Sequence, residues 1–421
     1  MSATANTVSL IGTRLAVFRV NAMDVFSFCP AVQRVFFTSA VAIMIHPICY
    51  NGAMDDEKNF WNDTGRILII LALVIASTSL IMTLLTKSME KKEEAAAISA
   101  SASAYWLPEE TTNVVNVFAA GTVNTTMQSS DYSACVSSLS EIISTSGFSS
   151  YQQESLIGTD LPSQFGDAMV SSGFNLVGLA NPASLAHGKD GIDSSMAYWT
   201  DSSAMTSGTN TSTDSQNQLR IAEADGVSAA FLSFTDLLDD PIPENENYLV
   251  NVYDDEKSPL LVNKAAQNAD IVIVSIFWNG GQGALPNDRQ KQIAEALAGA
   301  GASVIIGNAE NAVQPVCWID DTLVFYSLGN LLTDEIDSTD RIGAIGAVTV
   351  TEITAGTTHR IELTNPKVDL VVSCPQSDGS VVVKPISDVT EAELPDREGL
   401  YDGYSQTLKR MDDSIRIGGL Y

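Results

Sequence analysis

Histidine, the side chain that most often ligates catalytic metals and moves protons near neutral pH, occurs only three times in this chain. The three residues are His46, His187 and His359, and no two of them are close in sequence. A centre built on clustered imidazoles would need them to converge from distant positions. The count therefore nearly excludes histidine-rich metal chemistry, and His187 is expected to be a hydrogen-bonding or surface residue.

The other reactive residue types form no motif either. The five cysteines are an odd number without a Cys-x-x-Cys pair, which is neither a disulfide framework nor a zinc site, so we expect buried apolar residues. Gly280-Gly281-Gln282-Gly283 lacks the Lys-Ser/Thr of a phosphate-binding loop and is predicted to be an ordinary loop. Ser233, Ser275 and Ser327 have neither a G-x-S-x-G elbow nor a plausible base.

Charge narrows the choice of partners. The chain has 22 Lys and Arg against 51 Asp and Glu, which gives a formal charge of -29. Residues 1–94 hold 8 residues of each sign, so residues 95–421 carry the whole imbalance. Such an acidic body repels phosphate backbones and anionic membrane surfaces. We therefore expect no nucleic-acid partner and no docking on an anionic membrane face.

One segment has the length and composition of a membrane anchor. Ile67 to Leu85 are nineteen uncharged residues bracketed by Arg66 and Lys87, close to the number that a spanning helix needs. We predict a single-pass transmembrane helix over 67–85 in a cell-membrane protein. A buried helix of a soluble protein and a cleaved signal peptide fit this length and position less well.

The orientation of this helix rests on weaker signals. Basic residues adjacent to the helix slightly favour a cytoplasmic C-terminal part, whereas counting all of 1–66 reverses the bias. An Ala/Ser-rich linker over 86–112, followed by an acidic domain rich in Ser, Thr and Asn, favours an extracytoplasmic one. We expect 1–66 in the cytoplasm. Within it, 1–53 has no clear caps or period, so a misassigned start codon is an open alternative.

From Asn113 onward, short apolar runs alternate with helical stretches. The predicted strands are Val114–Ala120, Asn175–Ala180, Val227–Thr235, Ile271–Trp278, Ser303–Gly307, Leu323–Leu328, Ala344–Ile353, Arg360–Leu370 and Ser380–Lys384. The predicted helices are Tyr132–Ser146, Ser163–Ser172, Ser258–Ala269 and Asp288–Ala300, the last with Asp288 as its N-cap. Alternating helix and strand over 258–307 is typical of a parallel α/β layout.

Residues 269–330 read ADIVIVSIFWNGGQGALPNDRQKQIAEALAGAGASVIIGNAENAVQPV and, further on, LVFYSLGN. This block resembles the CapA/PgsA family of capsule and poly-γ-glutamate synthesis proteins. GFNLVGLANPASLAHGKDG and DGVSAAFLSFTD resemble two earlier blocks of that family, in the same order. The residues in register with it are Pro286, Gln290, Gly301, Gly307, Gln314-Pro315 and Tyr326–Asn330. The resemblance covers residues 113–386 and leaves 387–421 as a C-terminal extension.

The resemblance implies a fold similar to calcineurin-like metallophosphoesterases, an α/β/β/α sandwich, here preceded by a single transmembrane helix. In such folds divalent metals bind where loop carboxylates and imidazoles converge at the strand ends. The positions that match the family's ligands carry other residues here, namely Thr122, Ala183, Phe277, Asn308, Ala309 and Asn311. The carboxylate of the family's NLE motif has no confident counterpart before Phe165. Phe and Ala offer no lone pair, and an Asn carbonyl is a weak ligand, so we predict no metal cofactor, no catalytic residue and no enzyme activity.

Remnants of that site can still form a pocket. Its predicted lining is Thr122, Asn181, Trp278, Asn308, Glu310, Asn311 and Asn330. Two interpretations stay open for its Asn and Glu residues, either a site for Ca²⁺, a sugar or a peptide, or ordinary surface loops. Trp278 is interpreted as a core or pocket-wall residue in preference to a sugar platform.

Two functions of different class follow. The first is a membrane-anchored, catalytically silent CapA-like protein that acts outside the cell in capsule or poly-γ-glutamate assembly, export or attachment. Its expected partners are other membrane subunits of a polymer synthesis or export complex. The second is a divergent metal-dependent hydrolase on the same fold, which would cleave a phosphoester or polymer bond with relocated carboxylates.

Overall fold

The structure is a computed structural model that describes residues 57–104, 110–129, 131–279, 283–308, 312–335, 337 and 339–421, with no side chains described for 57–67 and 99–104. The chain divides into two compact units, Met1–Trp106 and Leu107–Tyr421. The expectations for residues 1–53, including Cys29, His46 and Cys49, lie outside the described residues. So does most of the glycine-rich loop at 280–283.

The described part of the first unit is one long helix, α2 (Glu57–Ala104). Among the described residues it is the one helix long and apolar enough to cross a membrane, over Leu68–Ile98. Its large apolar side chains are exposed to the surroundings, as lipid-facing residues are when no lipid is present. The helix continues through most of the segment expected to be a linker, because the Ala, Glu and Lys of 86–104 favour helix.

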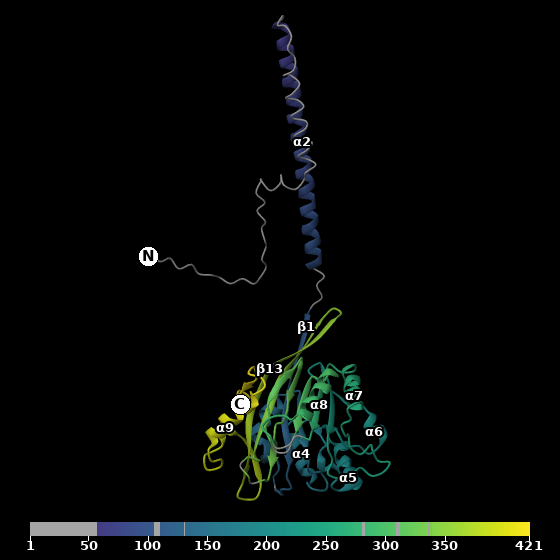
Figure 1. The fold of residues 1–421 in the computed structure, drawn as a ribbon, viewed down its shortest axis with the longest axis vertical. Coiled ribbons are helices and arrows are strands. Elements are labelled where there is room, and N and C mark those ends of the chain that lie inside the picture. The colour runs from purple at the N-terminus through teal and green to yellow at the C-terminus, as the bar shows by residue number, and fades with distance from the viewer. Residues whose placement is uncertain are drawn as a thin grey trace, which may run out of the picture. The chain divides into compact units, whose positions relative to one another are not determined.

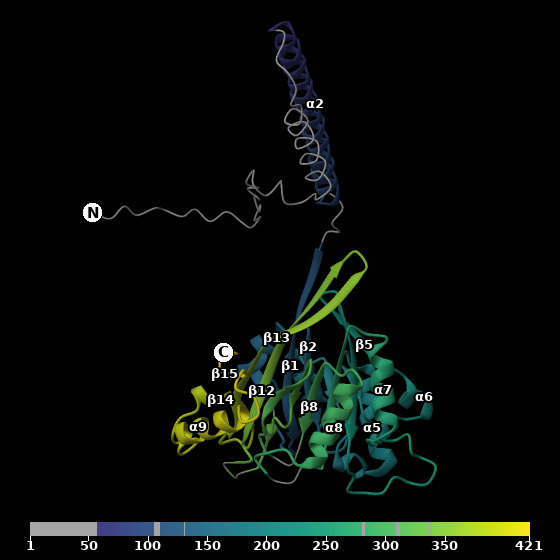
Figure 2. The same cartoon turned by 45° about the horizontal axis from the view of Figure 1, so that its top comes forward.

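The second unit contains two β-sheets, drawn in Figures 1 and 2. The larger has nine strands, seven of them in the spatial order β14-β13-β12-β1-β2-β3-β4, with β11 paired to β1 and β15 to β13. Their bounds are β14 (Val381–Pro385), β13 (Thr358–Pro375), β12 (Ile342–Ala355), β1 (Glu110–Asn124), β2 (Phe148–Gln153), β3 (Leu176–Gly178), β4 (Met205–Ser207), β11 (Asn330–Thr333) and β15 (Arg416–Ile417). β1 is parallel to β2 and antiparallel to β12.

The smaller sheet has six strands in the order β5-β6-β7-β8-β10-β9. Their bounds are β5 (Ile221–Ala224), β6 (Val227–Thr235), β7 (Ile271–Phe277), β8 (Val304–Asn308), β10 (Thr322–Phe325) and β9 (Val316–Ile319). β6, β7 and β8 are parallel neighbours, so their carboxyl ends lie at one edge of the sheet. β1, β2 and β3 are likewise parallel in the larger sheet.

Three buried clusters of apolar side chains define four layers. One lies between the sheets and includes Val117 of β1 and Ile273 of β7. A second lies between the outer face of the larger sheet and its helices, and the third between the smaller sheet and its helices. The helices on the larger sheet are η2 (Ser133–Leu139), α3 (Ser140–Ser144), α4 (Ser163–Ser171), η3 (Pro182–Leu185) and α5 (Gly188–Asp201). The helices on the smaller sheet are α7 (Lys257–Ala266) and α8 (Asp288–Gly299). The second unit is therefore an α/β/β/α sandwich, as the sequence predicts.

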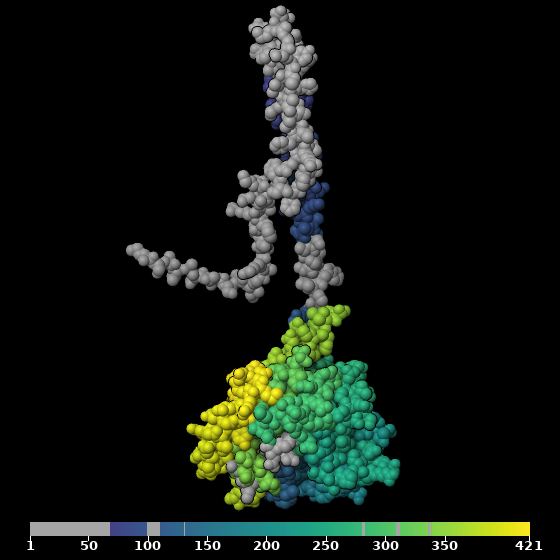
Figure 3. Space-filling view, viewed as in Figure 1, coloured from purple at the N-terminus to yellow at the C-terminus, as the bar shows by residue number. Residues whose placement is uncertain are grey.

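Two segments complete this unit. The short helix α6 (Thr213–Asn217) precedes β5. The extension, residues 387–421, begins within the short helix η4 (Ile386–Asp388) and contains α9 (Arg397–Leu408) and β15. Figure 3 shows the C-terminal residues, in yellow, on one flank of the unit. Leu394, Leu408 and Ile415 are buried in the cluster between the sheets, so the extension is part of the core.

Most predicted elements are present, with three corrections. The predicted helix Tyr132–Ser146 is a 3-10 turn followed by one α-turn, with Val136 in a non-helical conformation, because serine hydroxyls in this stretch bond to backbone carbonyls. Asn287 caps α8 instead of Asp288, since its side chain accepts a hydrogen bond from the Gln290 amide. The strand predicted over Leu323–Leu328 ends at Phe325, before the left-handed turn at Gly329.

The cysteine expectation is confirmed for the three described residues. Cys135, Cys317 and Cys374 are buried and unpaired with one another. Burial raises the pKa of the Cys135 and Cys317 thiols to about 11, which keeps them protonated and unreactive at neutral pH.

Candidate functional site

The residues at the family's ligand positions lie at the carboxyl ends of parallel strands in both sheets. Thr122 is near the end of β1, Phe277 ends β7, and Asn308 ends β8. Asn181 and Ala183 follow β3, within the turn that forms η3. Ala309, Glu310 and Asn311 lie outside the described residues. The fold thus brings the described positions among them to one edge of the sandwich, where the site of the related folds is expected.

Thr122 and Asn330 are buried neighbours in the register of β1 and β11. The Thr122 hydroxyl lies 3.1 Å from the carbonyl oxygen of Gly329 and 3.3 Å from Asn330 Oδ1, while Asn330 Nδ2 donates to the carbonyl of Asp340 at 2.9 Å. The strands approach closely here, since a Cβ on Gly121 would lie 2.0 Å from the Gly329 oxygen. The polar atoms of Thr122 and Asn330 are therefore used within the fold.

A chain of neutral hydrogen bonds connects the two sheets below the strand ends. Asn308 Nδ2 donates to Ser275 Oγ at 3.2 Å, and Ser275 Oγ donates to Gln152 Oε1 at 2.8 Å. Gln152 Nε2 then donates to the carbonyl of Ala180 at 2.9 Å. All three side chains are buried. Amide and hydroxyl groups thus hold the sheets together here without any charged residue in the network.

The asparagines of this edge are not surface residues. Asn181 is fully buried, and its Nδ2 donates to the carbonyls of Gln153 at 3.1 Å and Leu179 at 3.2 Å. Asn308 is 1% exposed, and its Oδ1 has no hydrogen-bond partner among the described residues. The surface-loop interpretation is therefore wrong for these two residues, because each satisfies backbone groups that close packing removes from water.

Trp278 is a core residue. Its side chain is fully buried, and the indole Nε1 donates to the carbonyl of Tyr326 at 3.0 Å. A Cβ on Gly307 would lie 2.1 Å from the indole ring, so the ring packs directly on the backbone of β8. A buried ring in this position is not available as a platform for a sugar.

Glu154 is an acidic residue of this edge that the sequence reasoning missed. It directly follows β2, and its backbone amide donates to the carbonyl of Val123 at 3.0 Å. Burial raises the pKa of Glu154 to about 8, with a further contribution from the negative charge of Asp239, while a hydrogen bond with the Thr122 hydroxyl lowers it. At neutral pH the carboxyl group is therefore mostly protonated and neutral.

The position of Glu154 directly after a strand could have identified it, but the polar composition of that strand concealed the strand itself. β2 reads FSSYQQ and is buried along its whole length, yet four of its six residues are polar, so apolar patterning indicated no strand. Glu154 is the first carboxylate after that strand, and β2 is the parallel neighbour of β1. It is therefore a strand-end carboxylate that the apolar pattern gave no reason to place at this edge.

A second carboxylate at this edge is neutralised by an arginine. Asp236 follows β6 and is 8% exposed, and Arg289 of α8 donates to it through Nη2 at 2.8 Å and Nε at 3.3 Å. Arg289 Nη1 also lies 2.8 Å from Asp255. These carboxylates raise the pKa of the Arg289 guanidinium, which stays charged. Asp236 is therefore engaged in a charge-assisted pair.

The donor set does not fit the divalent metal centre that the fold family implies. Among the described residues at these strand ends, the hydroxyl groups and amide nitrogens are bonded to protein, Asn181 and Asn308 each offer only a neutral carbonyl oxygen, Glu154 is mostly neutral, and Asp236 is paired. A two-metal centre needs several charged ligands to hold its ions and to lower the pKa of a bound water. No catalytic step through such a metal follows from these residues.

His187 lies near the same edge at the start of α5, and its Nε2 is 2.6 Å from Asp160 Oδ1. Its side chain is 45% exposed, so it is the hydrogen-bonding surface residue that the sequence predicts.

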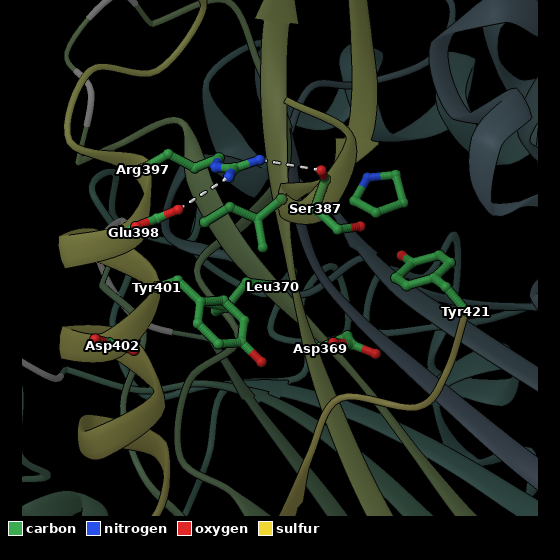
Figure 4. A pocket seen from close by; sticks show the side chains of 10 residues that line it. Asp369, Leu370, Ser387, Arg397, Glu398, Tyr401, Asp402 and Tyr421 are labelled. Atoms are coloured by element: carbon green, nitrogen blue, oxygen red, sulfur yellow. Dashed lines mark hydrogen bonds and ion pairs between the residues drawn. The ribbon is translucent and has the colours of Figure 1, made fainter. Parts of the chain in front are cut away.

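A separate concavity of about 430 Å³ lies beside the C-terminal segment. Figure 4 shows Tyr401 and Tyr421 on different walls, with Asp369 between them and Arg397 paired to Glu398. Arg397 also donates to the carbonyl oxygens of Ser387 and Val389, so its charge serves the local fold. This pocket contains none of the strand-end residues.

Comparison with known proteins identifies the protein family that has this fold and this arrangement of strand ends. The family described as "Bacterial capsule synthesis protein PGA_cap" matches residues 104–335, more than half of the 421 residues. The chain belongs to this family, and the resemblance found in the sequence is confirmed.

Two relatives align with the chain over part of their length. "PGA biosynthesis protein CapA" of Bacillus subtilis (strain 168) is 29% identical over 164 residues, which cover 38% of this chain and 43% of the relative. "Capsule biosynthesis protein CapA" of Bacillus anthracis is 25% identical over 178 residues, which cover 40% and 42%. The chain thus spans less than half the length of these relatives. A solved hypothetical protein from Thermus thermophilus aligns with 59% of this chain and 98% of its own, at 12% identity and a TM-score of 0.34.

Proposed function

We propose that this protein takes part in capsule or poly-γ-glutamate assembly, export or attachment as a membrane-anchored component without catalytic activity at the strand ends. The family membership and the two CapA relatives support the pathway. The neutral hydrogen-bond network of Asn308, Ser275 and Gln152 carries the proposal of catalytic silence, because uncharged amide and hydroxyl groups occupy this part of the edge and leave no charged ligand there. α2 is the proposed anchor, with residues 107–421 outside the cell.

The proposed partner is another membrane subunit of the synthesis or export complex. The acidic body makes direct capture of a polyanionic polymer unfavourable, since like charges repel and confer no specificity. An anchor raises the local concentration of the domain near such a subunit, so a modest protein interface suffices.

The decisive experiment is a hydrolysis assay on purified residues 107–421 with a generic phosphodiester and with poly-γ-glutamate, in the presence of Mn²⁺, Zn²⁺ or Mg²⁺. Both sheets and all three buried clusters lie within this segment, which should therefore fold by itself. We expect no turnover above the buffer rate. Metal-dependent turnover that is lost in the Glu154→Gln variant would contradict catalytic silence.

One observation favours a hydrolase as the second candidate. A carboxylic acid with a pKa of about 8 stays protonated at neutral pH and is able to donate a proton to a leaving group. Asp239 contributes to that raised pKa and would be the second carboxylate. For this candidate, turnover should fall as pH rises through about 8, and Glu154→Gln should abolish it while Asp240→Asn, which changes the adjacent carboxylate, should not.

A further inference from the structure

Three potential metal ligands converge near the turn of the long hairpin β12–β13, away from the strand-end site. They are Asp270, Glu352 and His359, and one ligand atom from each lies within 4.8 Å of the other two. His359 Nε2 is 3.0 Å from Glu352 Oε1 and 3.2 Å from Asp270 Oδ1. Figure 2 shows this hairpin and the start of β1 extending beyond the remaining strands.

The register of the larger sheet explains how two of these residues meet. Thr354 of β12 is directly opposite His359 of β13, so Glu352, two residues away, is the diagonal neighbour of His359 on the same face. Val350 and Val348 lie on that same face of β12 and are buried between the two sheets. The polar cluster therefore begins where the apolar packing between the sheets ends.

Asp270 reaches the cluster from the other sheet. It immediately precedes β7, whose first residue, Ile271, is buried between the sheets. The cluster thus joins the hairpin of the nine-stranded sheet to the six-stranded sheet. Its members are brought together by sheet packing, since Asp270 is distant in sequence from Glu352 and His359.

Each carboxylate is held by its other oxygen. Asn113, directly opposite Glu352 in the β1–β12 register, donates from Nδ2 to Glu352 Oε2 at 2.6 Å. The amide and hydroxyl of Ser228 donate to Asp270 Oδ2 at 2.8 Å and 2.6 Å. Both carboxylates therefore keep one oxygen fixed and turn the other toward His359. Carboxylates that bind metals are commonly oriented in this way by neighbouring donors.

The charges of the cluster favour a cation. A neutral imidazole has at most one proton on Nε2, which cannot satisfy two carboxylate oxygens equally. A divalent metal in place of that proton would balance both carboxylates. Bonds of about 2.0–2.2 Å in a tetrahedral site place neighbouring ligand atoms about 3.3 Å apart, close to the 3.0 Å and 3.2 Å that separate His359 Nε2 from the two carboxylate oxygens. The half-exposed His359 leaves the cluster open to a water ligand.

We propose that Asp270, Glu352 and His359 bind one divalent transition-metal ion, with Zn²⁺ the best match to an imidazole and two carboxylates. The metal fastens the hairpin to the smaller sheet. It lies apart from the strand ends, so this proposal is independent of catalytic silence there.

The test is a calorimetric titration of chelator-treated residues 107–421 with Zn²⁺ alone. Wild type should bind one equivalent, and His359→Ala should weaken binding at least tenfold. His187→Ala is the matched control, because His187 contacts one carboxylate, Asp160, and should leave Zn²⁺ affinity unchanged. Asn113→Ala removes no ligand but frees Glu352, and should weaken binding about 10- to 100-fold.

Two further measurements make the result decisive. Circular dichroism without metal should be the same for all variants, and the melting temperature should rise on Zn²⁺ addition in wild type and not in His359→Ala. No binding to wild type, or equal binding to His359→Ala, would overturn the proposal and leave a simple ion-paired cluster. A full equivalent kept by His359→Ala but lost in Glu154→Gln would place the metal at the strand ends and also contradict the silent site.

Discussion

Glu154 lies beside Thr122 at the ends of two neighbouring parallel strands, β1 and β2, where the Glu154 amide donates to the carbonyl oxygen of Val123, the residue after Thr122, at 3.0 Å. The family resemblance places an aspartate at the position of Thr122, which would put two carboxylates side by side. With threonine there, this position supplies no negative charge to share a divalent cation with Glu154. Burial then raises the Glu154 pKa to about 8, which removes its charge at neutral pH. Neither Thr122 nor Glu154 therefore carries a full charge at neutral pH.

Glu154→Gln tests this relationship through stability. Because the folded-state pKa of about 8 exceeds the ordinary value of 4.5, the native chain keeps a proton that the unfolded chain releases between these pH values. The free energy of unfolding of wild type should therefore fall as pH rises from about 5 to 8. The glutamine variant should lack this decline and gain on the order of 2 kcal/mol over wild type at pH 8.

Urea denaturation of residues 107–421 at pH 5 and pH 8 measures the effect. Glu223→Gln, which changes an exposed carboxylate, is the control. This variant keeps Glu154, so its unfolding free energy should still fall between pH 5 and pH 8. Identical pH slopes for wild type and Glu154→Gln would show that Glu154 ionises normally in the folded state.

Arg289→Ala should destabilise the domain strongly. It leaves the Asp236 carboxylate, which is 8% exposed, without the guanidinium that accompanies it. We expect a loss of about 2–4 kcal/mol in unfolding free energy. Lys257→Ala breaks a solvent-exposed pair with Asp254 and should change stability little by comparison. Equal effects of the two substitutions in thermal or urea unfolding would refute a structural role for the Arg289–Asp236 pair.

The proposed orientation predicts protease sensitivity. If α2 spans the membrane with residues 107–421 outside, protease added to intact cells should remove the domain while a cytoplasmic marker stays intact. Immunoblotting against the C-terminal residues reads out the loss. Complete protection in intact cells, together with digestion after lysis, would reverse the orientation.

The partner proposal predicts co-purification from gently solubilised membranes. The full chain should retain a membrane subunit of the polymer complex, and a chain whose 67–85 is replaced by an unrelated span should retain it too, provided that residues 107–421 form the contact. Retention is measured by mass spectrometry of the affinity-purified complex. A domain that purifies alone in both forms, yet binds isolated poly-γ-glutamate at moderate salt, would favour polymer binding over a protein partner.

Local sequence was enough to predict the elements whose hydrophobic pattern is set by burial. Val227–Thr235 was predicted with the bounds of β6, and β7 and β8 within one residue, because strands covered on both faces are continuous apolar runs. The candidate membrane span was equally plain, because no charge interrupts it. β2 was missed because four of its six buried residues are serine and glutamine, which bond to groups outside β2.

The sequence by itself also determined which ligand types are missing, since Thr122, Phe277 and Asn308 are read directly from the chain. What these residues do instead was decided by tertiary structure. The Asn308–Ser275–Gln152 network crosses between two sheets, and the raised pKa of Glu154 depends on burial by distant segments. The contact between Asp270 and His359 also depends on tertiary structure, because Asp270 adjoins the smaller sheet and His359 belongs to the larger one. Hydrogen bonds and electrostatic effects depend on distance in space, and sheet packing sets that distance between residues far apart in the chain.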